Sequence, residues 1–279
     1  MPSVFSHIRR KNIIIGILSA VFFLSVPLII FYSSGYSLRT GFHVVKTGGI
    51  NLLFLPGGSS VSVDGKFYKK IPVFSDQLFI QGLNTGIHTI RAEKENYYPW
   101  IKRLEIKAQK VAVGYVLLVP VNPEIKNIPR YIPITGRKPG VDGQSRQYAD
   151  LSVILQKNNI TGKIRIKKKV VIWREGKRIF ARWKGRKKMT PEFLVDNFFF
   201  KKNLIYQAKG EILDFDFYPG RNDTILISEH GHGIFTLEMD KRPPYQNAHK
   251  IMVNACNFAV INDIIYVHEN EKIILVRLE

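Results

Sequence analysis

The sequence predicts an all-β protein carried by one N-terminal transmembrane helix. Three observations support this prediction: an uncharged apolar segment near the N-terminus, short strand-like segments with regular turns from residue 48 onward, and a strand-and-turn pattern that recurs near the C-terminus. The chain has 279 residues, enough for about two folded domains of ~150 residues each. Cys256 is its only cysteine, which excludes an intrachain disulfide and a zinc site built on several cysteines.

Residues 13–32 contain no charged side chain, and about twenty residues at ~1.5 Å rise per residue cross the hydrocarbon core of a bilayer. Arg9, Arg10 and Lys11 precede this segment, whereas the next dozen residues carry a single Lys or Arg. Because the cytoplasmic flanks of transmembrane helices are enriched in basic residues, the sequence predicts a cytoplasmic basic tail at 1–12. Everything after the helix is expected outside the cytoplasm, on a single-pass protein of the cytoplasmic membrane.

A cleaved signal peptide is the alternative interpretation of the same segment. The apolar core of a signal peptide spans only ~7–15 residues and is followed by an A-x-A-like cleavage site, whereas this segment is longer and ends in Ile-Ile-Phe-Tyr. Both interpretations place the rest of the chain in an extracytoplasmic compartment.

Residues 48–120 alternate short apolar segments with turn sequences. Val61 and Val63 fall on one face of an extended segment that the dipeptide Asp64-Gly65 follows, and such a dipeptide favours a two-residue hairpin turn in which both residues have positive φ. Six or seven short strands in about seventy residues predict a β-sandwich.

The segment Pro56-Gly57-Gly58-Ser59-Ser60-Val61-Ser62-Val63-Asp64-Gly65-Lys66 resembles the signature of the PEGA domain, a small bacterial β-sandwich. Ser59 stands where the family usually has alanine, and Thr85 and Asn96 stand where it has proline and glycine. The resemblance implies that this segment is a structural motif. The residues agree, because a calcium loop needs more than one carboxylate and a P-loop needs a helix after its glycine and lysine. The motif positions are Pro56, Gly58, Val61, Val63, Asp64, Gly65, Pro72, Gly86, His88 and Tyr97.

Residues 121–150 are rich in proline and predict an extended interdomain linker. The next domain, 151–279, is predicted to be a partial β-propeller-like unit, because Phe217 and Phe258 begin similar strand-turn-strand segments 41 residues apart. The first of these segments also resembles a blade found in PEGA-containing bacterial membrane proteins. There is room for about three blades, so we expect a partner to cover an exposed edge.

The charge of the chain is strongly positive, with 42 Lys and Arg against 22 Asp and Glu for a net charge of +20. A net +12 lies within residues 163–188, where the pattern predicts a β-hairpin with one apolar and one basic face. Interleaved Trp173, Phe180 and Trp183 also fit a nucleic-acid surface, although an exported domain rarely meets nucleic acid. The candidate polyanion contacts are Lys163, Arg165, Lys167, Lys168, Lys169, Arg174, Lys177, Arg178, Arg182, Lys184, Arg186, Lys187 and Lys188.

No cofactor and no catalytic residue is predicted, because no recognisable catalytic or phosphate-binding motif occurs. His230 and His232 are weak metal candidates, since alternate residues on a strand project to one face, but a third ligand would have to come from His249, Glu238 or His268. Cys256 is expected to be buried and not reactive.

Topology and charge, together with what the resemblance to bacterial PEGA proteins implies, predict a non-catalytic scaffold or binding protein of the bacterial cell envelope. Its expected partners are anionic lipid, a cell-wall polymer or another protein. One alternative is a propeller-based ligand sensor or hydrolase, and the other is a nucleic-acid-binding protein that uses residues 163–188.

Overall fold

The computed structural model describes most of the chain, in two compact units. The residues it describes are 3–39, 43–128, 151–153, 155, 164–194, 202–254, 257–270 and 272–278. Unit 1 comprises the segments Met1–Leu53, Gln77–His88 and Leu104–Gly114, and unit 2 comprises Phe54–Asp76, Thr89–Arg103 and Tyr115–Glu279.

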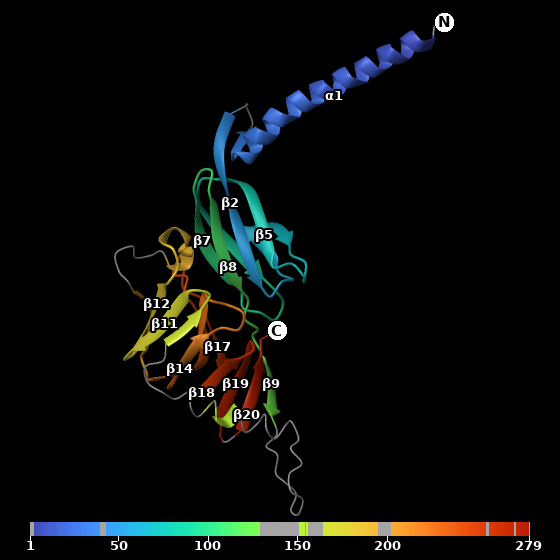
Figure 1. Ribbon diagram of the computed structural model, residues 1–279. Helices are drawn as coiled ribbons and strands as arrows, with labels where there is room; N and C mark the ends of the chain where they lie inside the picture. Colours follow the sequence, from blue (N-terminus) through green and yellow to red (C-terminus); the bar gives the residue numbers. More distant parts are fainter. Residues whose placement is uncertain are drawn as a thin grey trace, which may run out of the picture. The chain divides into compact units, whose positions relative to one another are not determined.

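Helix α1 runs from Ser3 to Ser33 (Figure 1). Its segment Ile13–Ser33 is long and apolar enough to cross a membrane, as predicted. The helix begins well before residue 13, so most of the predicted tail is helical. Arg and Lys are good helix formers, which explains why the basic segment continues the helix. Pro27 lies inside the helix, where lipid-exposed helices tolerate proline if neighbouring groups satisfy the freed carbonyl.

One four-stranded sheet belongs mostly to unit 1, and its strands β2, β5 and β8 are seen side by side in Figure 1. Strand β2 pairs with β1, β5 and β8, and the β5 pairing is antiparallel, with Ile50 opposite Ile80. Inward-facing residues such as Ile50, Leu52, Leu78 and Ile80 are buried, which is the period-2 pattern of a half-buried strand. Its strands are β1 (Tyr36–Arg39), β2 (His43–Leu55), β5 (Gln77–Asn84) and β8 (Val111–Leu117).

A second sheet has the strand order β4-β3-β6-β7. Its strands are β3 (Ser60–Val63), β4 (Lys66–Lys70), β6 (Gly86–Glu93) and β7 (Trp100–Ile106). The two sheets give residues 48–120 the number of strands that the sequence predicts. Face-to-face packing as a sandwich stays a prediction.

The Asp64-Gly65 turn between β3 and β4 has the predicted geometry, with φ of 51° and 77°. The Asp64 carboxylate accepts a hydrogen bond from the backbone N–H of Thr89 at 2.8 Å, which ties the turn to β6. Asn96 also has positive φ, 63°, at the position where the PEGA pattern has glycine. The chemistry of these turns therefore follows from the residues that occupy them.

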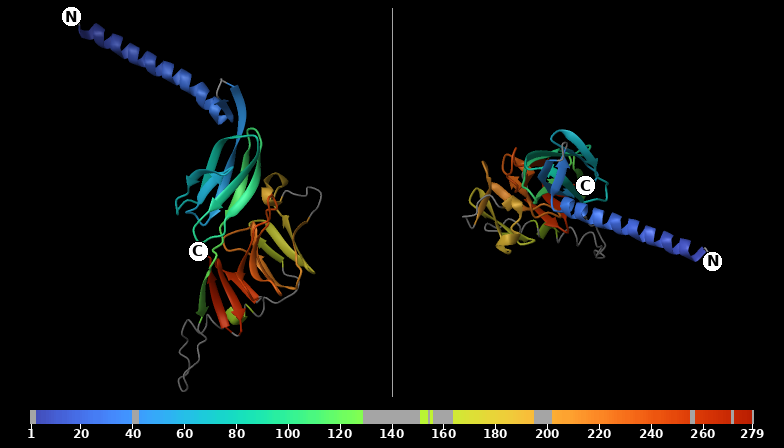
Figure 2. Two further views of the ribbon diagram at one scale, coloured as in Figure 1. Left: turned by 180° about the vertical axis from the view of Figure 1, so that it is seen from behind. Right: turned by 90° about the horizontal axis from the view of Figure 1, so that it is seen from above.

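Three four-stranded antiparallel sheets follow one another in unit 2, coloured mainly yellow, orange and red in Figure 2, except that β9 of the third sheet is green. The first contains β10 (Ile164–Lys167), β11 (Val170–Glu175), β12 (Arg178–Trp183) and β13 (Asn203–Gln207). The second contains β14 (Ile212–Phe217), β15 (Thr224–Glu229), β16 (Gly233–Glu238) and β17 (Ala248–Met252). The third contains β18 (Asn257–Ile261), β19 (Ile264–Glu269), β20 (Lys272–Arg277) and β9 (Glu124–Ile128). Two 3₁₀ turns, η1 (Lys187–Met189) and η2 (Glu192–Leu194), lie between β12 and β13.

Apolar layers hold these three sheets together. Ile172 and Ile179 of the first sheet share a core with Phe215 of the second. Leu226 of the second sheet shares another core with Phe258 of the third. Strand β14 of the second sheet lies beside β10 of the first sheet and β18 of the third.

Strand β9 lies within the segment 121–150 that the sequence assigns to a linker. It is antiparallel to β20, with Ile128 opposite Ile273 and Glu124 opposite Arg277. The C-terminal segment supplies only three strands of the third sheet, and β9 satisfies the backbone groups that β20 would otherwise leave at an edge. The remainder of the predicted linker, 129–150, lies outside the described residues.

Replacing Gly65 with valine should destabilise the protein by about 1–3 kcal/mol, because a β-branched residue is strained at positive φ. No atom lies within 4 Å of a Cβ built at Gly65, so the effect would come from backbone strain and not from a clash. The measurement is chemical unfolding of the full-length chain in detergent, followed by circular dichroism. Gly65→Asn is the control and should unfold close to the wild type; equal stability of the valine and asparagine variants would contradict this explanation.

Candidate functional site

The basic segment forms the predicted hairpin. Strands β11 and β12 pair with Val170 opposite Trp183 and Glu175 opposite Arg178. One face of the hairpin, which includes Val170, Ile172 and Ile179, is buried in the core between the first two sheets of unit 2. The predicted hairpin and its core face are confirmed. The opposite face is not wholly basic as predicted, because Val171 and Phe180 on it are also buried.

Three of the candidate polyanion contacts are instead engaged inside the protein. The Arg165 guanidinium lies 3.3 Å from the Asp216 carboxylate, and the Lys167 ammonium lies 3.2 Å from Asp263. Arg174 donates a hydrogen bond to the carbonyl of Ile212. These three side chains are partly buried and hold the first sheet to its neighbours. Lys163 lies outside the described residues.

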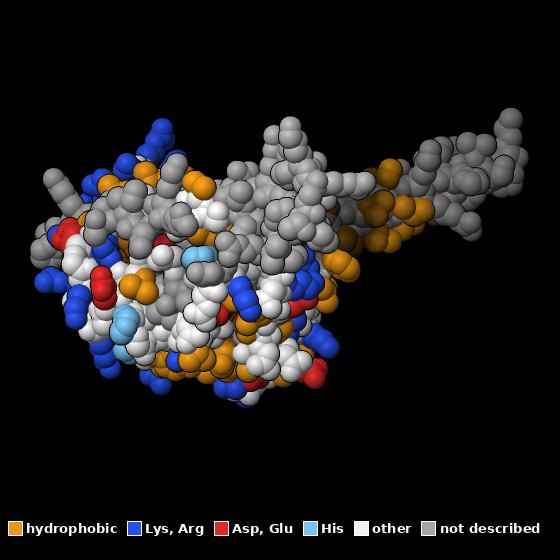
Figure 3. All heavy atoms as spheres, turned by 90° about the horizontal axis from the view of Figure 1, so that it is seen from below, with side chains coloured by type: hydrophobic (Ala, Val, Ile, Leu, Met, Phe, Trp, Pro, Cys, Tyr) orange, Lys and Arg blue, Asp and Glu red, His pale blue; other side chains and the backbone are white. Residues whose placement is uncertain are grey.

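Nine candidates have exposed side chains, and six of them gather at one end of the first sheet. The backbone N–H of Lys184 donates to the carbonyl of Lys169 at 2.8 Å, which brings the β10–β11 turn against the segment after β12. We call these six residues the basic end: Lys168, Lys169, Lys184, Arg186, Lys187 and Lys188. The other exposed candidates are Lys177, Arg178 and Arg182. On the face of the molecule shown in Figure 3, Lys and Arg side chains stand along much of the outline.

The turn between β10 and β11 has an unusual backbone. Lys168 and Lys169 both have positive φ, 44° and 69°. Glycine and asparagine are the usual residues in such a turn, because a longer side chain costs backbone energy at positive φ. A pair of lysines here therefore places two cations at a tight turn at a cost in stability, and strained residues of this kind often mark functional sites.

Trp183 fixes the segment that comes after β12. Its indole N–H donates to the carbonyl of Arg186 at 3.1 Å, and its ring packs against the core. A Cβ at Gly185 would come within 2.5 Å of the Trp183 ring, so this loop needs glycine to lie over the indole. The partly buried Trp183 side chain therefore holds the loop that carries Lys184 and Arg186.

The only acidic residue of the hairpin lies at its opposite end. The Glu175 carboxylate is 2.8 Å from the Lys202 ammonium and accepts a hydrogen bond from the Trp173 indole at 2.9 Å. Both contacts favour the ionised form, Lys202 more than Trp173, and hold the pKa of Glu175 below its ordinary value. The basic end therefore lies away from the negative charge of the hairpin.

The aromatic residues of the hairpin do not form a free stacking platform. Phe180 is 6% exposed, and its ring stacks against Trp173 at 5.8 Å between centroids. Arg182 lies over the Trp173 ring, and Lys202 lies over Phe180. Trp183 packs on the core, so all three rings make contacts within the fold.

His230 and His232 lie in the exposed turn between β15 and β16 and not on a strand. His232 Nδ1 is 3.4 Å from the buried Glu229 carboxylate. Two of the expected third ligands are engaged elsewhere: His249 stacks on Tyr98 at 4.5 Å, and Glu238 binds Lys102. No group of three or more metal-ligating side chains occurs within the part of the chain that the structure describes.

The buried Glu229 carboxylate is held by hydrogen bonds from other segments of unit 2. Burial opposes its ionisation, but hydrogen bonds from the Tyr206 hydroxyl at 2.5 Å and the Gly210 N–H at 2.6 Å outweigh burial. The pKa of Glu229 consequently lies below its ordinary value. Burial of the Tyr206 hydroxyl, together with its hydrogen bond to Glu229, raises the pKa of Tyr206. The carboxylate joins β13, the segment before β14, and the end of β15.

A buried ion pair was not anticipated from the sequence. Lys102 on β7 is fully buried, and its ammonium lies 3.1 Å from the carboxylate of Glu238 on β16. The carboxylate also accepts hydrogen bonds from Trp100 at 2.9 Å and Asn247 at 2.6 Å. A signal was present, because Trp100, Lys102, Leu104 and Ile106 alternate along β7 and all are buried.

Comparison with protein-family models and with curated proteins finds no match to this chain.

Several of the PEGA-like positions lie at turns or make contacts within the fold. Pro56 follows the last residue of β2, and Gly58 and Gly86 have positive φ, 83° and 133°. His88 on β6 shares a hydrogen bond of 2.9 Å with the carbonyl of Asn84, and the Tyr97 ring lies 4.5 Å from the ammonium of Lys94. The predicted surroundings of Cys256 cannot be compared, because this residue lies outside the described residues.

Breaking the buried pair should cost far more than breaking an exposed pair. Lys102→Met and Glu238→Gln should each lower the free energy of unfolding by about 3–5 kcal/mol, since each leaves a buried charge without its partner. The double variant should lose less than the sum of the single variants, because it leaves neither charge unpaired.

The measurement is urea unfolding of the full-length chain in detergent micelles, arranged as a double-mutant cycle. Lys126→Met and Glu124→Gln form the control cycle, since these side chains pair at 2.8 Å but are about half exposed. Each control variant should lose at most about 1 kcal/mol. Strict additivity at Lys102 and Glu238 would show that the two side chains are not coupled.

Proposed function

We propose that this chain is a single-pass, membrane-anchored and non-catalytic binding or scaffold protein of the bacterial cell envelope. In this proposal α1 is the anchor, residues 48–120 form a PEGA-like β-sandwich, and residues 151–279 form a partial propeller-like domain outside the cytoplasm. The basic end contacts a polyanion, either a wall polymer or anionic lipid headgroups.

The observation that carries this proposal is the convergence of six exposed cations at one end of the first sheet in unit 2. Three separate features produce it: the strained turn at Lys168 and Lys169, the backbone hydrogen bond from Lys184, and the loop supported by Trp183. A polyanion with repeated charges gains from several cations held close together, because each bound charge adds a contact without ordering a new loop.

A repeated phosphate ligand fits this surface better than nucleic acid does. Phosphates need only cations and N–H donors, whereas sequence-tolerant binding of single strands also uses exposed aromatic rings. Trp183 and Phe180 are engaged within the fold, so the surface supplies the charges without the stacking.

The arrangement of the membrane anchor is open to a direct test. Alkaline phosphatase fused after Glu279 should be active in a bacterial host, because the basic residues that precede the apolar segment Ile13–Ser33 of α1 favour a cytoplasmic N-terminus. β-Galactosidase fused at the same position should be inactive. The opposite pattern of the two reporters would place unit 2 in the cytoplasm and overturn the proposed location.

Inorganic polyphosphate is a suitable probe for the basic end. The full-length chain in nanodiscs of phosphatidylcholine should bind polyphosphate, and the logarithm of the binding constant should fall with the logarithm of salt concentration. Replacing Lys184, Lys187 and Lys188 with Gln should make that slope shallower by roughly 0.7 for each lysine–phosphate ion pair removed, the value for a flexible phosphate strand.

The control removes the same number of lysines from another exposed strand, β4, through Lys66→Gln, Lys69→Gln and Lys70→Gln. This variant has the same net charge as the first but an intact basic end. Equal losses of affinity in both variants would show that net charge, and not the basic end, is responsible.

A further inference from the structure

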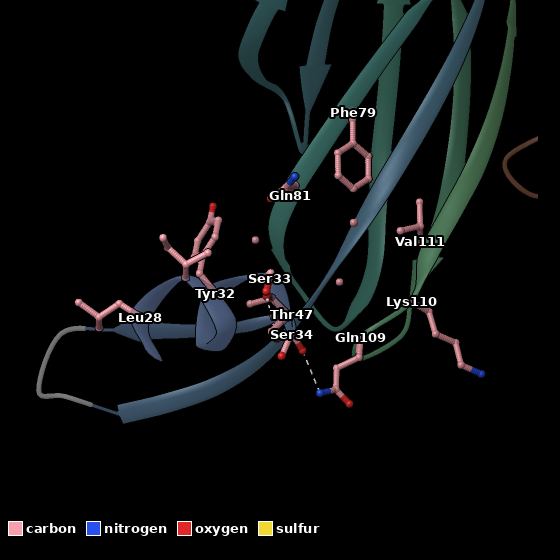
Figure 4. Close-up of a pocket in the computed structure, with 15 residues that line it drawn as sticks. Leu28, Tyr32, Ser33, Ser34, Thr47, Phe79, Gln81, Gln109, Lys110 and Val111 are labelled. Atoms are coloured by element: carbon pink, nitrogen blue, oxygen red, sulfur yellow. Dashed lines mark hydrogen bonds between the residues drawn. The ribbon is translucent and has the colours of Figure 1, made fainter. Parts of the chain in front are cut away.

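A groove of about 690 Å³ lies in unit 1 where the last turns of α1 meet the strands (Figure 4). Leu28, Ile29 and Tyr32 line it from the helix, and Phe79 and Val111 line it from β5 and β8. A polar wall, which includes Ser34 and Gln109, completes it. The groove therefore joins apolar and polar surfaces at the point where the proposed membrane anchor ends.

Phe79 in this groove departs from the alternation of its strand. Along β5, Leu78 and Ile80 are buried, whereas Gln77 and Gln81 are exposed. Phe79 lies between the two glutamines on the exposed face and is 45% exposed. Val111 on β8 is 46% exposed, so Phe79 and Val111 together give the groove an apolar surface on its strand side.

Contacts between the helix end and the strands build the groove. The Gln109 side chain donates a hydrogen bond to the carbonyl of Ser34 at 2.9 Å, drawn as a dashed line in Figure 4. The backbone N–H of Thr47 donates to the carbonyl of Gly35 at 2.7 Å. The rings of Phe31 and Tyr36 stack at 5.3 Å. These contacts hold the end of α1, and the two residues that follow it, to β1, β2 and the β7–β8 turn.

Two glycines keep one side of the groove free of side chains. A Cβ at Gly49 would come within 2.9 Å of the Ile80 carbonyl oxygen and 3.2 Å of the Phe79 ring. A Cβ at Gly48 would come within 2.5 Å of the Lys107 carbonyl oxygen. Glycine is required at both positions, and the bare backbone lets the ring of Phe79 lie against β2.

The charge near the groove is positive. Lys110 lines the groove, with its side chain directed outward at the rim in Figure 4. Lys46 is exposed on β2, next to Thr47 of the groove wall. Glu105 is the single acidic residue in the sequence of unit 1, and its carboxylate lies 3.2 Å from the ammonium of Lys107. This combination attracts an anionic ligand that also has an apolar part.

We propose that the groove binds an anionic membrane phospholipid from the leaflet that surrounds the C-terminal end of α1. An acyl chain lies against Phe79, Val111 and the end of α1, and Lys110 contacts the phosphate of the headgroup. This inference rests on the proposed anchoring of α1 in a membrane, which surrounds the last turns of the helix with lipid.

Photo-labelling of the full-length chain in nanodiscs tests the site. The discs contain equal amounts of phosphatidylglycerol and phosphatidylcholine, and one of the two carries a diazirine on its acyl chain. Labelled phosphatidylglycerol should cross-link to peptides that contain Phe79 and Val111, in addition to α1. Labelled phosphatidylcholine should cross-link to α1 and only weakly to β5 and β8.

Matched variants separate the groove from general lipid contact. Lys110→Ala should reduce phosphatidylglycerol labelling of β5 by about fivefold, the loss typical for one basic side chain at an anionic bilayer. Phe79→Gln should reduce labelling of β8 by a similar factor. The controls are Lys66→Ala and Phe67→Gln on β4 in unit 2, where Phe67 is 71% exposed, and both should label as the wild type does.

The outcomes distinguish this site from the membrane anchor itself. Labelling confined to α1, or equal labelling of β5 by both lipids, would overturn the groove site and leave the anchor intact. A chain that fails to co-migrate with nanodiscs would overturn the anchor and the lipid site together. Loss of labelling in Lys66→Ala as large as in Lys110→Ala would also overturn the site.

Discussion

The buried ammonium of Lys102 sets the strictest constraint on unit 2. A fully buried cation needs several oxygen partners, because desolvation of the charge costs more than one carboxylate returns. Lys102 has four: the Glu238 carboxylate and the carbonyls of Asp240, Arg242 and Tyr245. Those carbonyls all come from the connection between β16 and β17, so the connection has to keep one conformation. Asp240 stabilises that conformation by accepting hydrogen bonds from the backbone and the guanidinium of Arg242. Such a charge selects one arrangement of segments that lie far apart in sequence, whatever its net contribution to stability.

Burial of acidic residues also explains where the positive charge of the protein is found. Among the described residues, the buried charged side chains are five acids, Asp214, Asp223, Glu229, Glu238 and Asp240, and two bases, Lys102 and Arg221. The interior thus removes more negative than positive charge from the surface. The chain already carries a net charge of +20, and burial leaves the remaining surface more positive than the composition alone suggests. Polyanion binding by the basic end would use charge that the packing of the core leaves outside.

The sequence predicted those features that depend on neighbouring residues. Alternation along the chain indicated the strands, and the preference of Asp64 and Gly65 for positive φ indicated the turn between β3 and β4. It missed features that depend on distant residues. Strand β9 was assigned to the linker because its partner β20 lies about 150 residues away, and nothing within Glu124–Ile128 indicates that pairing. The Lys168 and Lys169 turn was missed because lysine disfavours positive φ, so its propensity argues against the observed backbone. Lys102 could have been found, since it occupies an inward position in an otherwise apolar alternation, but its partner Glu238 could not.

The two proposed binding sites act through charge in different surroundings, and salt should therefore affect them differently. Salt screens exposed charges strongly, with a Debye length of about 8 Å at physiological ionic strength. The basic end consists of exposed Lys and Arg side chains, so its affinity depends almost wholly on screened attraction. The groove in unit 1 combines Lys110 with Phe79, Val111 and the apolar end of α1. Burial of apolar surface is insensitive to moderate salt, so lipid held in the groove should remain at ionic strengths that release a polyanion from the basic end. A protein with both sites could then exchange its soluble or wall-bound partner while its lipid contact persists.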